Sequence, residues 1–382
     1  MSISLILLFV SLFTWGVGEG MFIYFQPIYL QQLGASMLVI ASVFSIYGAA
    51  MMIAHIPAGF LADRFGRKPL LIVSWVVGML AAFVMALARS LPVFVTGMLL
   101  YGMTNFVYSP LNSYVTAARG RLSPARAMTF SSAAYNLGGV IGPVAGGWIG
   151  DRLGLREVYP IAACVLLVST LILLLIRSQP TEAPDPNQPS ANIITNTRLI
   201  RFVGIAFLAM FVMYVPQPLT PNFLQDQRHL SLSTIGWLGA ASSLGNVVLN
   251  IVLGQFAART GFLLAQVSVA LFSLLLWRGS GVPWYALGYF LLGGYRASRP
   301  LISAQVRTLV QPAQMGLAYG IAETFNSLGA VLAPLLAGVL YTRGPVLVYP
   351  VSLALGAVAL LVSGLLAPRE AAGSPLPGII HA

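Results

Sequence analysis

The chain has 382 residues, of which 58% are hydrophobic and only 8% are charged. Soluble globular domains carry about 25% charged residues, so this composition excludes a soluble protein and indicates an integral membrane protein. The formal net charge of +11 is therefore not read as affinity for nucleic acid.

Twelve apolar runs follow one another along the chain, and each is long enough to cross a ~30 Å hydrocarbon core as a helix. Their centres lie near residues 17, 49, 80, 104, 138, 168, 211, 246, 270, 295, 328 and 358. The first run has no basic residue before it, so we expect a retained span and not a cleaved signal peptide. The sequence therefore predicts an all-α membrane protein with 12 transmembrane helices.

The longest polar interruption, residues 178–197, contains four Pro and several Ser, Thr and Asn. Such a segment is a flexible linker, and it divides the runs into six and six. We predict an N-terminal six-helix bundle at 1–177, a cytoplasmic linker at 178–197, a C-terminal six-helix bundle at 198–368 and a cytoplasmic tail at 369–382. Lys and Arg divide twelve to six between alternate loops, which places both termini in the cytoplasm by the positive-inside rule.

The two halves repeat one another at a nearly constant offset. Gln26-Pro27 recurs as Gln217-Pro218, 191 residues later. The same offset links Gly138 with Gly329 and Pro143 with Pro334. Because each half has an even number of spans, we expect parallel repeats related by an axis along the membrane normal.

Polar side chains recur with a period of three spans. Spans 1, 4, 7 and 10 are the richest in them, whereas spans 3, 6, 9 and 12 have no charge in their interiors. Polar groups at membrane depth face protein or a water-filled cavity, so we expect the first span of each triplet to line a central cavity and the third to face lipid. The expected lining is Gln26, Asn105, Tyr108, Tyr135, Asn136, Tyr214, Gln217 and Asn326.

Charged residues inside the predicted spans are candidates for proton or substrate binding. Desolvation disfavours an ionised carboxylate, so Glu19 in span 1 either exchanges a proton near neutral pH or is a neutral, hydrogen-bonded structural group. Arg296 and Arg299 lie in the inner half of span 10, where a buried arginine attracts an anionic substrate group or forms a gate. Glu323 in span 11 has a similar depth, so we expect it to pair with one of the two arginines.

A dense charge cluster separates the second and third runs. It contains Gly59, Asp63, Arg64, Gly66 and Arg67. The stretch resembles the signature of the major facilitator superfamily between spans 2 and 3, Gly-x-Leu-x-Asp-Arg-x-Gly-Arg-Lys, with every position of that signature present. The resemblance implies the major facilitator fold of two six-helix bundles, and it implies that Asp63 caps a helix of the opposite half and latches the cytoplasmic side shut. The alternative is a plain loop that its basic residues hold in the cytoplasm.

Span 5 resembles a motif that antiporters of this superfamily often carry. Its residues are Gly138, Gly142, Pro143, Gly146 and Gly147. Glycines four residues apart share one helix face, so the motif predicts a hinge or close contact between the halves, or simply tight helix packing. One departure leaves the coupling mode open: Met98 stands four residues before Gly102, where drug–proton antiporters of the superfamily usually have an Arg.

These features together predict a secondary active transporter, not an enzyme, in a bacterial inner membrane. We expect a monomer that exports a small lipophilic or amphipathic molecule by alternating access in exchange for protons, with no cofactor and no nucleic-acid partner. The alternatives are an importer or uniporter of a sugar or organic acid and, in another class, a membrane receptor that transports nothing.

Overall fold

The computed structural model describes residues 2–65, 67–120, 122–179, 196–310 and 315–368, without the side chains of 55–65, 108–109, 124–125 and 315–317. All regular structure in these segments is helical. The first half comprises α1 (Ile3–Ile23), α2 (Gln26–Gln32), α3 (Met37–Phe65), α4 (Arg67–Leu87), α5 (Leu91–Met103), the 3-10 turn η1 (Thr104–Val107), α6 (Tyr108–Ala118), α7 (Pro124–Leu153) and α8 (Leu155–Leu174). The second half comprises α9 (Thr197–Tyr214), α10 (Thr220–Asp226), α11 (Leu232–Leu253), α12 (Ala258–Arg278), α13 (Val282–Arg307), α14 (Met315–Arg343), η4 (Pro345–Leu347) and α15 (Val348–Leu366).

Within the described segments, nine helices are long and apolar enough to cross a membrane, or ten if the bent pair Leu91–Val107 and Pro110–Ala118 forms one span. Helices α7 and α13 fall outside this set although they have 30 and 26 residues, because their sequences are less apolar. All twelve predicted centres fall in helical segments, with 104 in η1. The predicted all-α membrane fold is confirmed, while the count of twelve spans stays a prediction.

Two predicted spans are broken at matching places in the two halves. The first span breaks between α1 and α2, and the seventh breaks between α9 and α10. Each short second helix carries a proline in its first turn, Pro27 in α2 and Pro221 in α10. Proline is tolerated there because the first N–H groups of a helix have no intrahelical acceptor.

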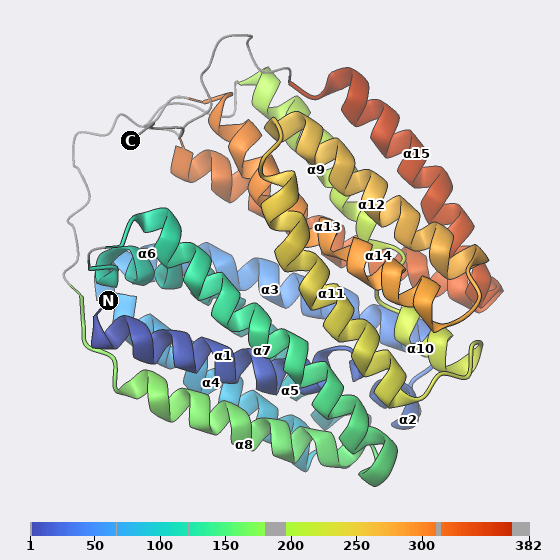
Figure 1. Ribbon diagram of the computed structural model, residues 1–382, viewed down its shortest axis with the longest axis horizontal. Coiled ribbons are helices and arrows are strands. Elements are labelled where there is room, and N and C mark those ends of the chain that lie inside the picture. Colours follow the sequence, from blue (N-terminus) through green and yellow to red (C-terminus); the bar gives the residue numbers. More distant parts are fainter. Residues whose placement is uncertain (1, 66, 121, 180–195, 311–314, 369–382) are drawn as a thin grey trace.

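Both chain ends of the described structure lie at the same end of the molecule, which we call the terminal end (Figure 1). In the first half, the Ser2 hydroxyl donates to the Ala118 carbonyl at 2.9 Å, which joins the start of α1 to the end of α6. In the second half, the Asn196 amide donates to the Leu309 carbonyl at 2.9 Å. The opposite end, which carries α2, α10 and the turn at Gly154, is the distal end.

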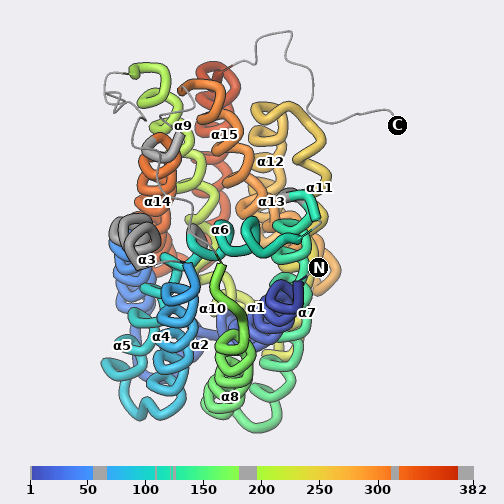
Figure 2. The backbone as a smooth tube through the Cα atoms, turned by 90° about the vertical axis from the view of Figure 1, so that its left-hand side faces the viewer, coloured from blue at the N-terminus to red at the C-terminus, as the bar shows by residue number. Residues whose placement is uncertain are grey.

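The two halves form two groups of helices when viewed from the terminal end (Figure 2). They meet along two seams, in which α7 packs on α11 and α3 packs on α14. One buried apolar cluster crosses between the halves near the distal end and includes Phe25 and Ile28 together with Leu219 and Phe223. A second cluster lies within the second half alone. The halves therefore share a continuous core at the distal end.

Residues related by the sequence repeat meet in space. The Asn222 amide donates to the Gln31 side-chain oxygen at 2.6 Å, and these two residues are 191 positions apart. In the first half, the rings of Tyr29 and Tyr159 lie 4.8 Å apart. At matching positions in the second half, the hydroxyls of Thr220 and Tyr349 are 3.1 Å apart. This correspondence supports the predicted duplication.

Candidate functional site

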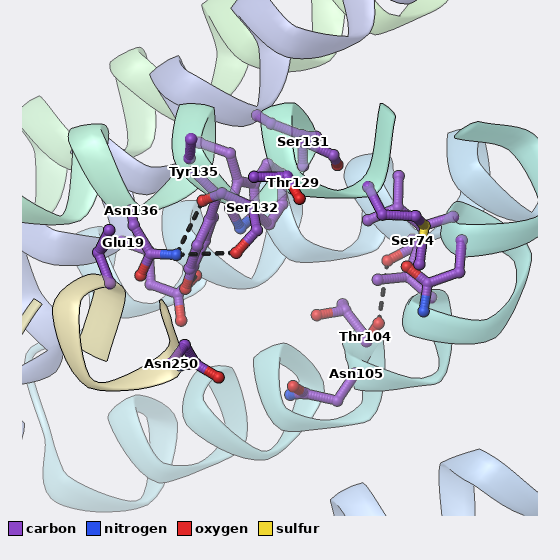
Figure 3. A pocket seen from close by; sticks show the side chains of 18 of the residues that line it. Glu19, Ser74, Thr104, Asn105, Thr129, Ser131, Ser132, Tyr135, Asn136 and Asn250 are labelled. Carbon is purple, nitrogen blue, oxygen red and sulfur yellow. Dashed lines mark hydrogen bonds between the residues drawn. The ribbon is translucent and has the colours of Figure 1, made fainter. Parts of the chain in front are cut away.

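A cavity of about 670 Å³ lies between the halves, on the terminal side of the seam where α7 meets α11. Most of its described wall belongs to the first half, from α1, α4, α5, η1, α6 and α7, and the second half contributes α11. Its polar lining residues are Glu19, Ser74, Thr104, Asn105, Asn112, Thr129, Ser131, Ser132, Tyr135, Asn136 and Asn250. Figure 3 shows Glu19, Tyr135, Asn136 and Asn250 on one side, with Ser74, Thr104 and Asn105 across from them.

Glu19 carries the only charged side chain among the described residues of this wall. The Tyr135 hydroxyl donates a hydrogen bond to its carboxylate at 3.0 Å, and the side chains of Tyr101 and Trp15 lie near it. Arg296 of α13 is close enough to act on the carboxylate electrostatically. A carboxyl group that faces a cavity among donors can hold a proton in one state and a cationic group in another.

An aromatic wall adjoins the carboxylate. The rings of Trp15 and Trp75 lie 4.9 Å apart, and Tyr101 stacks on Trp15 at 6.1 Å. The Trp75 indole N–H donates to the hydroxyls of Ser11 and Ser169 at 3.0 and 3.1 Å, so this ring is held from behind by α1 and α8. Aromatic faces of this kind bind apolar ring systems and cations.

A chain of side-chain amides crosses from one half to the other at the edge of the cavity. The Asn136 amide donates to Ser132, the Asn246 amide donates to Asn136 at 2.9 Å, and the Asn250 amide donates to Asn246 at 2.6 Å. Asn136 and Asn250 also line the cavity. A polar group of a bound molecule at this position would contact both halves.

The span-5 motif lies on α7 and contacts two different helices from two neighbouring faces. A methyl group added at Gly138, Gly142 or Gly146 would collide with backbone atoms of α1 in the same half. A methyl group added at Gly147 would instead collide with the Leu232 carbonyl of α11, and the Pro143 carbonyl lies against Gly236 of α11. The glycines spaced by four thus pack within the first half, while the contact between halves belongs to the neighbouring face.

Four of the predicted site residues come together in the cavity wall, namely Glu19, Asn105, Tyr135 and Asn136. The other predicted residues whose side chains the structure describes lie elsewhere. The Gln26 side chain is fully buried in α2, that of Asn326 is 1% exposed in α14, and the Gln217 amide donates to the Met213 carbonyl at 2.7 Å. Their predicted roles stay predictions.

A second group of predicted residues gathers inside the second half. The rings of Tyr214 and Tyr295 stack at 5.4 Å. Arg299 hydrogen-bonds with Tyr295, and the charges of Arg296 and Glu323 also act on that tyrosine. The three charged side chains therefore all lie near Tyr295. The predicted pair between Glu323 and one of the arginines stays a prediction.

The predicted cytoplasmic latch falls largely outside the described residues. Gly66 is not described, and Gly59 lies in α3, where the side chains of Asp63 and Arg64 are not described. The side chain of Tyr108, a predicted cavity residue, is not described either. Arg67 begins α4. The latch stays a prediction that follows from the resemblance.

The expectation that every third span faces only lipid is wrong for α4. Ser74 and Trp75 lie on this helix, and both line the cavity. The Ser74 hydroxyl donates to the Thr104 carbonyl at 3.0 Å, which fixes α4 against η1. A span without charged residues can still present polar and aromatic side chains to a cavity. The signal in the sequence that could have predicted this role for α4 is the serine followed by a tryptophan in an otherwise apolar run.

Comparisons with known proteins cover almost the whole chain. A sequence profile described as Major Facilitator Superfamily matches residues 6–204 and 202–379. The chain is 23% identical over 361 residues to Multidrug resistance protein 2 of Bacillus subtilis (strain 168), with 88% of each chain covered. It is 27% identical over 348 residues to Multidrug resistance protein MdtG of Citrobacter koseri, which covers 85% of this chain and 84% of the relative. Among solved structures, the nucleoside transporter NupG superposes with a TM-score of 0.78 at 15% identity, over 96% of this chain and 98% of NupG, and shares the fold.

Proposed function

This chain belongs to the Major Facilitator Superfamily, and on that premise we propose that it exports small amphipathic organic cations in exchange for protons. It is a membrane transporter of small molecules and not an enzyme. The names of its relatives refer to multidrug resistance, which supports export of foreign organic compounds. Bacterial relatives of this kind are multi-pass proteins of the inner membrane, and the predicted cytoplasmic position of both termini is part of the proposal.

The observation that carries the proposal is the Glu19 carboxyl group, the only charged side chain in the described cavity wall. A cation and a proton both neutralise a carboxylate, so they compete for it. Binding of the organic cation releases the proton, and proton uptake from the other side releases the cation. Trp15, Trp75 and Tyr101 supply the aromatic surface for the apolar part of the substrate.

Alternating access follows from the arrangement of the two halves. We propose that the bundles predicted at 1–177 and 198–368 rock about the cavity, with the linker at 178–197 connecting them. The buried core that the halves share lies at the distal end, and we therefore propose that this is the state in which the cavity serves the terminal side. With cytoplasmic termini, this is the state that loads substrate from the cytoplasm.

The substrate class can be tested with two probes of the same shape and opposite charge, tetraphenylphosphonium and tetraphenylborate. Titration of the purified protein, with quenching of the cavity tryptophans as the signal, should give saturable binding of the cation and none of the anion. Proton release into weakly buffered solution should accompany binding of the cation. Preferential binding of the anion would contradict the proposal.

An organic acid is the second candidate, because two arginines, Arg296 and Arg299, lie at membrane depth close to Tyr295. Neither arginine belongs to the described cavity wall. The cation is therefore the better supported substrate, and binding of tetraphenylborate that is lost in Arg296→Gln would favour the acid.

Tyr135→Phe removes the hydroxyl that donates to Glu19 at 3.0 Å. We expect about a tenfold change in cation affinity, since a hydrogen bond to a charged group contributes about 1.5–3 kcal/mol. The half-point of proton release should shift as well, because the lost hydrogen bond acts on the ionised form. Tyr285→Phe, whose hydroxyl donates to the Gly279 carbonyl far from the cavity, is the matched control.

Asp63→Asn tests the predicted latch on the cytoplasmic side. A carboxylate at a helix N-terminus contributes about 0.3–1 kcal/mol, and more when partly buried, so its loss should increase the fraction of molecules open to the cytoplasm and slow transport. Alkylation of cysteine probes at the two ends of the molecule measures this fraction. Equal probe rates in both proteins would count against a latch.

A further inference from the structure

Asp151 stands at an unfavourable place in its own helix. It is the third residue from the end of α7, which ends at Leu153. The carboxyl end of a helix carries partial negative charge, so an acidic residue there is destabilising. A compensating interaction is therefore expected outside α7.

The carboxylate makes that interaction with the other half of the molecule. One oxygen accepts the backbone N–H of Leu232 at 2.9 Å and the other accepts the backbone N–H of Ser233 at 2.8 Å. Leu232 and Ser233 are the first two residues of α11. The positive end of α11 thus meets the negative charge of Asp151 across the seam.

The contact completes the N-terminus of α11. The first four N–H groups of a helix have no intrahelical acceptor and need other partners. The Ser231 hydroxyl accepts from Thr234 at 3.2 Å, and the Ser231 carbonyl accepts from Ile235 at 3.0 Å. The Ile235 bond is the first within the helix, and the N–H groups of Leu232 and Ser233, which precede Thr234, are the ones that Asp151 binds, so α11 loses two partners whenever the halves part at this end.

The approach is close because the neighbouring residues of α7 are small. A methyl group at Gly147 would collide with the Leu232 carbonyl, and one at Gly150 would come within 3.0 Å of the Leu232 side chain. Farther along the distal end, the Gln31 amide donates to the Asp226 carboxylate at 3.0 Å, which is another polar contact between the halves.

Among the residues described at the distal end, the seam between α3 and α14 lacks this contact. Thr342 occupies the repeat-related position of α14, 191 residues after Asp151. Its hydroxyl donates to the Val339 carbonyl of its own helix at 3.0 Å. At the described distal end the capping carboxylate therefore stands on the α7–α11 seam, and the duplication supplies a natural control position on the other.

We propose that Asp151 is a latch that holds the distal end shut and that is released when the cavity opens to that side. The contact itself stands on the structure, while its part in a transport cycle rests on the proposed function. It is the counterpart, at the opposite end, of the latch that the sequence predicts at Asp63. In both, a carboxylate of the first half would cap a helix of the second half, so two opposed capping contacts would alternate.

The test measures how often the distal seam opens, without any transport. In a Cys164→Ser background, Ala240→Cys places the probe inside the seam, because Ala240 is 5% exposed and lies seven residues from both Ser233 and Val247 on the same face of α11. Ala162→Cys, fully buried in α8, reports on general loosening. The rate of alkylation by a maleimide is read for each probe in purified full-length protein.

Asp151→Ala should accelerate alkylation at position 240 about tenfold, which corresponds to about 1.4 kcal/mol, and leave position 162 unchanged. Asp151→Glu, which keeps the charge, should lie between wild type and Asp151→Ala. Thr342→Val should behave as wild type. An unchanged rate at position 240, or an equal acceleration at both positions, would overturn the latch. Because no substrate is present, either result is independent of whether the protein exports cations.

Discussion

Glu19→Gln is expected to reduce the affinity for an organic cation by about 10- to 100-fold and to abolish proton release on binding. The estimate follows from the about 1.5–3 kcal/mol that a hydrogen bond or contact with a charged group contributes. Glutamine has the size of a protonated glutamate and keeps an acceptor for the Tyr135 hydroxyl, which donates to Glu19 at 3.0 Å. The fold should therefore persist while the charge is lost.

The pH dependence gives this substitution a distinctive signature. In the wild-type protein the ionised carboxylate binds the cation and the protonated form does not, so affinity should rise with pH. In Glu19→Gln the affinity should be low and independent of pH. Glu157→Gln removes an exposed acid at the start of α8 and serves as the control, which should keep the wild-type profile. A wild-type profile in Glu19→Gln would show that the exchanged proton resides elsewhere.

Two neighbouring glycines of α7 should respond differently to the same substitution. Gly146→Ala places a methyl group against the Met21 carbonyl of α1, within the first half. Overpacking of a closely packed contact costs about 1–3 kcal/mol, so we expect a lower midpoint of thermal unfolding. Gly147→Ala places its methyl group against the Leu232 carbonyl of α11, across the seam. It should weaken only the state in which the distal end is closed.

Thermal unfolding and seam opening separate these two effects. Gly146→Ala should lower the unfolding midpoint, and Gly147→Ala should accelerate alkylation of the probe at position 240 with a smaller change in the midpoint. The pair provides its own control because the residues are adjacent and the added group is identical. If both substitutions changed the same observable to the same extent, the assignment of two separate faces to the motif would be wrong.

The fold could be predicted well because the lengths of the hydrophobic runs and the offset of the repeat can both be read directly from the order of the residues. Every predicted span centre falls in a helix, and Gln31 and Asn222, which the repeat relates, meet at 2.6 Å. The cavity wall is predicted in part for the same reason. Glu19, Asn105, Tyr135 and Asn136 are polar groups in apolar helices, and such groups need a cavity or protein partner.

The rest depends on how each helix is rotated about its axis, which composition alone does not specify. Trp75 faces the cavity because Ser11 and Ser169 bind its indole N–H, and these partners lie in spans far apart in sequence. The two faces of the span-5 motif differ by one residue, so glycine spacing could not assign one to α1 and the other to α11. Asp151 likewise looks like an ordinary loop acid until α11 is placed beside it.

The central claim is that protons and organic cations exchange through the cavity that contains Glu19. Its most direct test is efflux of tetraphenylphosphonium from proteoliposomes under an imposed pH gradient, with a pH dye recording proton movement. The claim predicts cation movement opposite to the proton gradient, coupled proton flow, and loss of both in Glu19→Gln. Cation efflux that ignores the gradient and moves no protons, in a preparation shown to bind the cation, would contradict it.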